Sequence, residues 1–160
     1  MATSSPNDSD FPLGNFHLLN SSNSRVTSSR SQAYNCISWA VGVNHKNFWP
    51  DGAGDISQEP AVEWPDEIPN EETVEAFVAF FQLFGYELCD GPEFEDGSVK
   101  VVVFVNHRGE PTHACRQVPN TGKWTSKMGI EGVDIEHDDL SSLEGPSNYG
   151  TAKVSMKKIL

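Results

Sequence analysis

The pattern of apolar and polar positions divides the chain into a helical first half and a strand-rich second half. Asn70 can cap a helix and Gly85 can end it, and apolar residues recur between them at helical spacing. These residues are Val74, Phe77, Val78, Phe81 and Phe84. A shorter helix is predicted to begin at Cys36, because Asn35 can cap it and Gly42 can end it. We expect the longer helix to pack across a sheet.

The second half has the pattern of an antiparallel sheet. Residues 99–105 form an almost unbroken β-branched run, which predicts a central strand buried on both faces. Further strands are predicted at 112–118, 124–128 and about 149–156, and the turn 119–122 would close a hairpin. Helices followed by strands predict an α+β fold, with N-terminal helices packed on an antiparallel sheet of about four to five strands.

Length and composition predict one folded domain. The chain has 160 residues, within the range of a single core. Residues 1–31 are rich in Ser and Asn and follow no helical or strand period, so we expect a disordered tail followed by a single domain over 32–160. The sequence shows neither a membrane-length apolar run nor a signal-peptide pattern, and its 3 Cys are too few for a disulfide scaffold. These features predict a cytoplasmic protein with free thiols.

The charge is negative and unevenly distributed. The chain has 11 Lys and Arg against 23 Asp and Glu, a net charge of −12, which argues against nucleic-acid binding. Of the acidic residues, 14 lie between Asp51 and Asp96, where there is no Lys or Arg. This stretch is either a solvated surface or a surface that attracts a basic substrate or partner.

Cys36 and His113 are the residues best placed for chemistry. A thiol in the first turn of a helix lies near unpaired backbone N–H groups, which lower its pKa and favour the thiolate. His113 follows a turn at the start of a predicted strand, so its imidazole can face a thiol on a helix lying over the sheet. Such a base can accept the thiol proton and later protonate the leaving group. The structural alternatives are a small buried apolar Cys36 and a hydrogen-bonded structural His113.

A third group is expected to orient the imidazole. If the turn 119–122 closes the hairpin, Ser126 and Gln117 lie on the face that carries His113. Asp134 is favoured on chemical grounds, because a carboxylate best stabilises an imidazolium. The sequence leaves the choice among these three residues open.

An oxyanion formed by attack on a carbonyl would be held by the backbone N–H of Cys36 and by a second donor. Asn35, Tyr34 and Gln32 are the nearby candidates for that donor. The sequence does not decide among them.

The sequence predicts no metal and no cofactor. The blocks His113-Ala-Cys115 and Asp134-Ile-Glu-His137 lack the paired spacing of zinc sites. No glycine-rich loop of the kind that cradles phosphates is present, so nucleotide hydrolysis has no support.

Four short blocks carry a resemblance to known proteins. They are Tyr34-Asn-Cys-Ile-Ser-Trp-Ala-Val-Gly42, Thr112-His-Ala-Cys-Arg-Gln117, Gly122-Lys-Trp-Thr-Ser-Lys-Met-Gly129 and Asp134-Ile-Glu-His137. The order of Cys, His and a later polar residue resembles the papain-like thiol hydrolases, particularly the compact NlpC-type and CHAP-type amidases. More closely, the blocks YNCxxWAxG and THAxRQ look like an uncharacterised family found in bacteria and fungi.

The papain-like resemblance implies a papain-like fold with Cys36 as nucleophile and His113 as general base. The sequence departs from that pattern in two ways. No Gln lies at the usual papain-type distance before the Cys, and the acidic stretch 51–96 is longer than a minimal NlpC-type domain needs.

The sequence therefore predicts a cysteine-dependent hydrolase or acyltransferase that acts on a peptide or side-chain amide through a Cys36 acyl-enzyme. Its partner would be a peptide or protein amide, with a basic substrate as one option, rather than a nucleic acid or a membrane. Deamidation of a protein glutamine is a variant of this hypothesis. The alternative is a non-catalytic binding module of the same fold, whose acidic 51–96 surface engages a basic partner.

Overall fold

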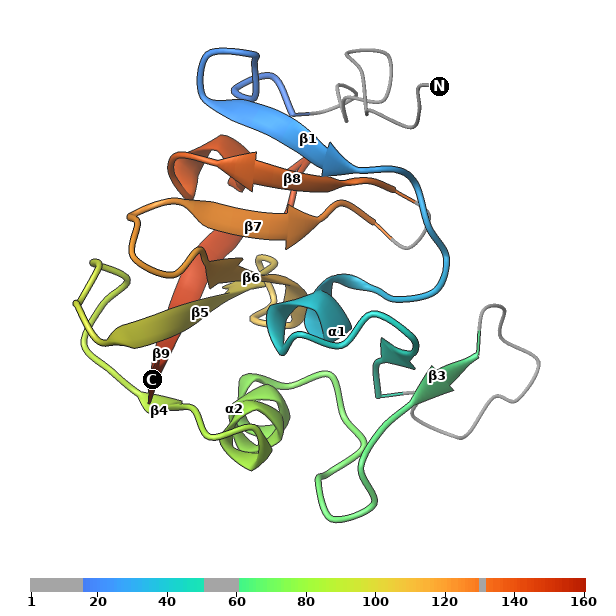
Figure 1. The fold of residues 1–160 in the computed structure, drawn as a ribbon. Coiled ribbons are helices and arrows are strands. Elements are labelled where there is room, and N and C mark those ends of the chain that lie inside the picture. The colour runs from blue at the N-terminus through green and yellow to red at the C-terminus, as the bar shows by residue number, and fades with distance from the viewer. Residues whose placement is uncertain (1–15, 51–60, 130–131) are drawn as a thin grey trace.

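The protein is built on one large antiparallel sheet. The computed structural model describes residues 16–50, 61–129 and 132–160. Within them, seven strands pair in the order β1-β8-β7-β6-β5-β9-β4, and β2 and β3 form a separate parallel pair (Figure 1). The strands are β1 (Ser24–Ser28), β2 (Asn47–Phe48), β3 (Val62–Glu63), β4 (Glu87–Leu88), β5 (Ser98–Val105), β6 (Pro111–Gln117), β7 (Trp124–Lys127), β8 (Asp134–His137) and β9 (Thr151–Ile159).

Two α-helices lie against one face of this sheet (Figure 1). Helix α1 (Cys36–Ala40) begins where predicted, because the Asn35 side chain accepts the Ser38 N–H at 3.0 Å. Helix α2 (Val74–Leu83) begins later than predicted, since Thr73 rather than Asn70 caps it through the Ala76 N–H. A 3-10 turn, η2 (Ser141–Leu143), follows β8. No helix in the described part of the chain is long and apolar enough to cross a membrane.

The sheet has a core on each face. The helix-side core joins both helices to the inward residues of β5, β6 and β9, and its members include Ile37, Ala40, Phe77, Phe80, Phe81, Val101, Val103, Ala114 and Met156. The far-side core covers the opposite face, and its members include Leu19, Val102, Phe104, Cys115, Trp124, Ile135 and Leu143. Because adjacent residues of a strand point to opposite faces, β5 serves both cores and is buried along its whole length, as predicted.

The predicted fold class is wrong. The expectation was an α+β, papain-like (NlpC-type) domain with N-terminal helices on a sheet of about four to five strands. The observed sheet has seven strands, and the described α-helices have only 5 and 10 residues. The missed strands β1, β4 and β8 are short and rich in polar residues, so they carry too little apolar alternation to be recognised. Strands β1 and β4 form by pairing with segments distant in the chain, and β8 forms by pairing with both the neighbouring β7 and the distant β1.

Part of the predicted disordered tail belongs to the sheet. Residues 1–15 lie outside the described residues, but β1 pairs antiparallel with β8, placing Val26 opposite Ile135. Leu19 is also buried, in the far-side core. The β1–β8 pairing joins segments more than 100 residues apart, which a local sequence pattern does not reveal. The ordering entropy of this segment is offset by ladder hydrogen bonds and by burial against β8.

The hairpin formed by β6 and β7 has the predicted register. Gln117 lies opposite Trp124, and the Val118 N–H donates to the Lys123 carbonyl at 2.9 Å. This register determines which side chains of β6 and β7 share a face.

Leu143→Ala tests whether the far-side core supports the fold. Leu143 is fully buried, so its truncation should lower the free energy of unfolding by about 2–5 kcal/mol, measured by urea denaturation. Leu88→Ala is the matched control, because Leu88 is 61% exposed and its truncation should change stability by no more than about 0.5 kcal/mol. Equal effects of the two substitutions would show that residues 140–149 do not pack as described.

Candidate functional site

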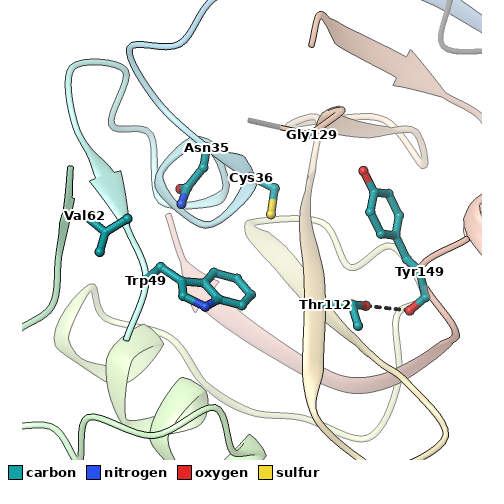
Figure 2. A pocket seen from close by; sticks show the side chains of 7 residues that line it. All are labelled: Asn35, Cys36, Trp49, Val62, Thr112, Gly129 and Tyr149. Carbon is teal, nitrogen blue, oxygen red and sulfur yellow. Dashed lines mark hydrogen bonds between the residues drawn. The ribbon is translucent and has the colours of Figure 1, made fainter. Parts of the chain in front are cut away.

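A pocket of about 230 Å³ opens beside the first turn of α1. Its described lining consists of Asn35, Cys36, Trp49, Val62, Thr112, Gly129 and Tyr149. Figure 2 shows Cys36 and Tyr149 reaching the pocket from two sides, with Trp49 below the thiol. None of these lining residues carries a charge. The pocket exceeds the roughly 150 Å³ of a cavity that binds benzene, so one acyl group or side chain of a substrate can enter it.

Helix α1 is held over β6 and β7 by contacts on its inner side. The Trp39 indole N–H donates to Thr125 Oγ1 at 3.0 Å, and the Arg116 guanidinium lies over the Trp39 ring at 5.5 Å. Ile37 and Ala40 are fully buried in the helix-side core. These contacts fix where Cys36 meets the sheet.

Cys36 meets the sheet where β6 and β7 separate. Among the described residues, the ladder between these strands consists of the pairs Arg116–Thr125 and Gln117–Trp124, and it does not continue toward the start of β6. The Ala114 N–H is hydrogen-bonded to the Cys36 thiol. That N–H belongs to the peptide bond that joins His113 to Ala114.

The pKa of the Cys36 thiol is raised to about 11, against the expectation from its place at the start of a helix. Burial is the largest cause, because a thiolate is poorly stabilised in an apolar environment. The N–H groups of Ala114, Cys36 and Ile37 and the charge of Lys127 act in the opposite direction, as predicted for a helix start, but they are outweighed. The resting thiol is therefore protonated at neutral pH.

His113 begins a chain of hydrogen bonds that runs across three strands. His113 Nε2 lies 3.1 Å from Ser126 Oγ, which lies 2.9 Å from His137 Nε2. His137 Nδ1 lies 2.8 Å from the Asp139 carbonyl oxygen. His113, Ser126 and His137 are almost completely buried. The structure thus brings Ser126 to His113, on the shared face that the hairpin register predicted.

The Asp139 carbonyl at the end of this hydrogen-bond chain determines which atoms of the chain donate and which accept. A carbonyl oxygen only accepts, so His137 Nδ1 carries the hydrogen and, in a neutral ring, Nε2 accepts from the Ser126 hydroxyl. Ser126 Oγ then accepts from His113 Nε2–H. His113 Nδ1 is left with an unshared electron pair, and it is buried without a hydrogen-bond partner.

Burial keeps both imidazoles neutral. The pKa of His113 lies well below its usual value, mainly through burial and then through repulsion from His137. The pKa of His137 is also lowered by burial, although the Asp139 carbonyl and nearby carboxylates counteract this. Neutral rings match the donor pattern of the chain.

Tyr149 connects His113 to the pocket. Its ring stacks on the His113 imidazole with centroids 3.9 Å apart and planes 5° apart. The imidazole makes a second aromatic contact, an edge-to-face approach to the Phe104 ring with centroids 5.5 Å apart. His113 has no hydrogen bond to Cys36 among the described contacts, and Tyr149 lines the pocket while His113 lies behind it.

Asp134 does not orient His113. It lies on the helix side of the sheet, where its carboxylate accepts from the Ser28 hydroxyl and, at 2.5 Å, from the Tyr34 hydroxyl. Burial, and then this bond to Asp134, raise the pKa of Tyr34 to about 12, so Tyr34 remains a donor. His113 shares the opposite face with Phe104. Asp134 therefore supports the segment before Cys36.

The remaining predicted residues have other partners. Gln117 donates to the Pro92 carbonyl at 3.3 Å, away from His113. Asn35 uses its oxygen to cap α1 and its Nδ2 to donate to the Phe48 carbonyl at 2.8 Å. Tyr34 donates to Asp134, and Gln32 is exposed and does not line the pocket. Of the three oxyanion candidates, Asn35 alone lines the pocket, and one of its two Nδ2 hydrogens is used by the Phe48 carbonyl.

Sequence reasoning missed the role of three residues. The sequence pattern places His137 only in a candidate metal block, Tyr149 only at the start of a strand, and Lys127 only within a strand. The described residues contain no group of three or more His, Cys, Asp or Glu that could hold a metal ion. The alternation of β8 puts His137 and Ile135 on one face, which is the signal that could have placed His137.

The comparisons with known proteins identify a family. A family model described as "Domain of unknown function (DUF7689)" matches residues 25–157. No curated protein and no solved structure matches the chain. The matched range contains the pocket and the whole hydrogen-bond chain.

The neutral imidazoles predict a pH-dependent stability. Unfolded histidines take up protons near pH 6.5, whereas His113 and His137 resist protonation in the folded state. The free energy of unfolding should therefore fall as pH decreases below 6.5, by up to about 1.4 kcal/mol per pH unit for each histidine. Urea denaturation between pH 7.5 and 5.5 measures this slope.

His137→Gln should reduce that slope, and His107→Gln, at an exposed loop position, should leave it unchanged. A slope in the parent protein that is insensitive to His137→Gln would contradict the assigned neutral state.

Proposed function

We propose that this chain, which belongs to the DUF7689 family, is a cysteine-dependent hydrolase or acyltransferase that acts on amides. Cys36 is the nucleophile and His113 the general base, as the sequence predicts. One observation carries the proposal: the buried hydrogen-bond chain leaves His113 Nδ1 as an unpartnered acceptor, one residue before the backbone N–H that binds the thiol. Ser126 takes the orienting role, and His137 supports it.

The Cys36 thiol proton moves to His113 as the sulfur attacks the substrate. At rest both partners are neutral, because burial disfavours the thiolate and the imidazolium alike. Formation of the ion pair offsets part of both costs, because opposite charges attract each other more strongly in a buried site than in water. The Ser126 oxygen stabilises the imidazolium through His113 Nε2–H.

The reaction then follows the chemistry of acyl transfer. The Cys36 sulfur attacks the amide carbon while His113 Nδ1 accepts the thiol proton. The C–N bond breaks and the amine leaves with that proton, which leaves an acyl group on Cys36. Water hydrolyses the thioester, or an amine attacks it in the acyltransferase variant. Release of ammonia from a glutamine side chain would be the deamidase variant of the same sequence of steps.

The cysteines support a cytosolic location for this activity. Cys36, Cys89 and Cys115 are all free thiols, as expected of a protein in a reducing compartment. Cys36 must also remain a reduced thiol to act as a nucleophile. The substrate is a peptide or protein amide.

The alternative of a binding module with an acidic surface has less support. Residues 51–60 of the acidic stretch lie outside the described residues. Among the described ones, Glu95 pairs with Lys100 and Lys157, and Glu63 pairs with Lys46. Part of this charge is therefore used within the fold.

Alkylation of Cys36 tests the proposed pair. Iodoacetamide should label Cys36 at neutral pH, and His113→Gln should slow this labelling on the order of 100-fold, because the thiol loses its base. In that variant the rate should rise only as pH approaches the pKa of the buried Cys36 thiol, about 11. Peptide-resolved mass spectrometry over pH 6–10 measures each cysteine separately.

Cys115 is the internal control for this experiment, because it is fully buried and does not line the pocket. Ser126→Ala should give an intermediate Cys36 rate, and His107→Gln should give the parent rate. A Cys36 rate that is unchanged in a folded His113→Gln protein would refute the pair. Full biological activity of Cys36→Ala, lost on charge reversal at Glu71 and Glu72, would favour the binding module.

A further inference from the structure

Acyl transfer needs a second hydrogen-bond donor for the developing oxyanion. The Tyr34 hydroxyl donates to Asp134, and the Asn35 side chain is held by bonds to Phe48 and Ser38 that use one of its two Nδ2 hydrogens. Thr112 also faces the pocket, but its hydroxyl donates to the Tyr149 carbonyl at 2.6 Å. Among the lining side chains, Tyr149 carries a hydroxyl whose hydrogen none of these bonds uses.

Tyr149 is held at the pocket by contacts around its ring. One face stacks on His113, and Phe16 and Phe104 approach with centroids at 5.2 and 6.3 Å. The Thr112 hydroxyl holds its backbone through the 2.6 Å bond. A side chain fixed in this way needs no rearrangement to act on a bound substrate.

The Tyr149 hydroxyl has a hydrogen to donate. Its oxygen accepts from the Gly129 backbone N–H, and its own hydrogen has no acceptor among the described residues. Burial, followed by the nearby Cys36, raises the pKa of Tyr149 above its usual range, so the hydroxyl stays protonated. In Figure 2 the Tyr149 ring stands across the pocket from the thiol.

We propose that Tyr149 is the second oxyanion donor of this site. This inference rests on the proposed function. As the Cys36 sulfur bonds to the substrate carbonyl carbon, the C=O electron pair moves to the oxygen, and the Tyr149 O–H donates a hydrogen bond to that oxygen. When the intermediate collapses, the C=O bond reforms, the leaving group departs, and Tyr149 retains its proton. Gly129 N–H orients the phenol, and the His113 stack fixes its plane.

Tyr149→Phe separates this role from others, because it removes the hydroxyl and keeps the ring. Acylation of Cys36 by p-nitrophenyl acetate passes through an oxyanion, whereas alkylation by iodoacetamide does not. We expect the acylation rate to fall on the order of 100-fold and the alkylation rate to stay within about twofold of the parent. Release of p-nitrophenolate and mass spectrometry of the Cys36 peptide measure the two rates.

Tyr86→Phe is the matched control, because Tyr86 is a buried tyrosine of the helix-side core that does not line the pocket. Both of its rates should equal those of the parent. Unchanged acylation in Tyr149→Phe, or equal loss of acylation and alkylation, would overturn the oxyanion role. So would a parent protein that is alkylated but not acylated at Cys36. Failure of the Cys36–His113 pair would instead appear as alkylation that is insensitive to His113→Gln.

Discussion

The separation of β6 from β7 near the start of β6 is the constraint on which the site depends. A continuous ladder would pair the Ala114 N–H with β7 and close the sheet between Cys36 and the far side. Because the described ladder stops at Arg116–Thr125, the Ala114 N–H is hydrogen-bonded to the Cys36 thiol. One backbone group thereby links a helix on one face to a histidine on the other. The pocket, the thiol and the imidazole all meet at this break in the sheet.

The buried polar groups around this break are costly unless they are satisfied. Three side chains of the far face, His113, Ser126 and His137, form a chain that ends on the Asp139 carbonyl. Each group along it has a partner, which offsets the cost of burying imidazole and hydroxyl groups. The exception is His113 Nδ1. A single unsatisfied acceptor in an otherwise complete network lowers the stability of the fold, and such groups are typical of functional sites.

One cluster of the described charges lies apart from the pocket. The described lining of the pocket is uncharged, while Glu95 lies at the other end of β5 and pairs with Lys100 and Lys157. Those two lysines hold the pKa of the exposed Glu95 carboxyl down, at about 2. Lys127 is a charge that does act on the thiol, where it favours the thiolate.

The sequence alone determined the elements whose signals are local. The cap at Asn35 placed the start of α1, the β-branched run placed β5, and the turn after β6 determined the register that brings Ser126 to His113. The choice of Cys36 and His113 as the candidate pair also came from the sequence. Only the tertiary structure decided the rest, because it depends on contacts between distant segments and on a strand, β8, that carries too little apolar alternation to be recognised. Pairing of β8 with the neighbouring β7 placed His137 beside Ser126, and pairing with the distant β1 placed Asp134 beside Ser28 on the opposite face. The stack of Tyr149 on His113, and the burial that raises the pKa of Cys36, arise from packing that no local pattern encodes.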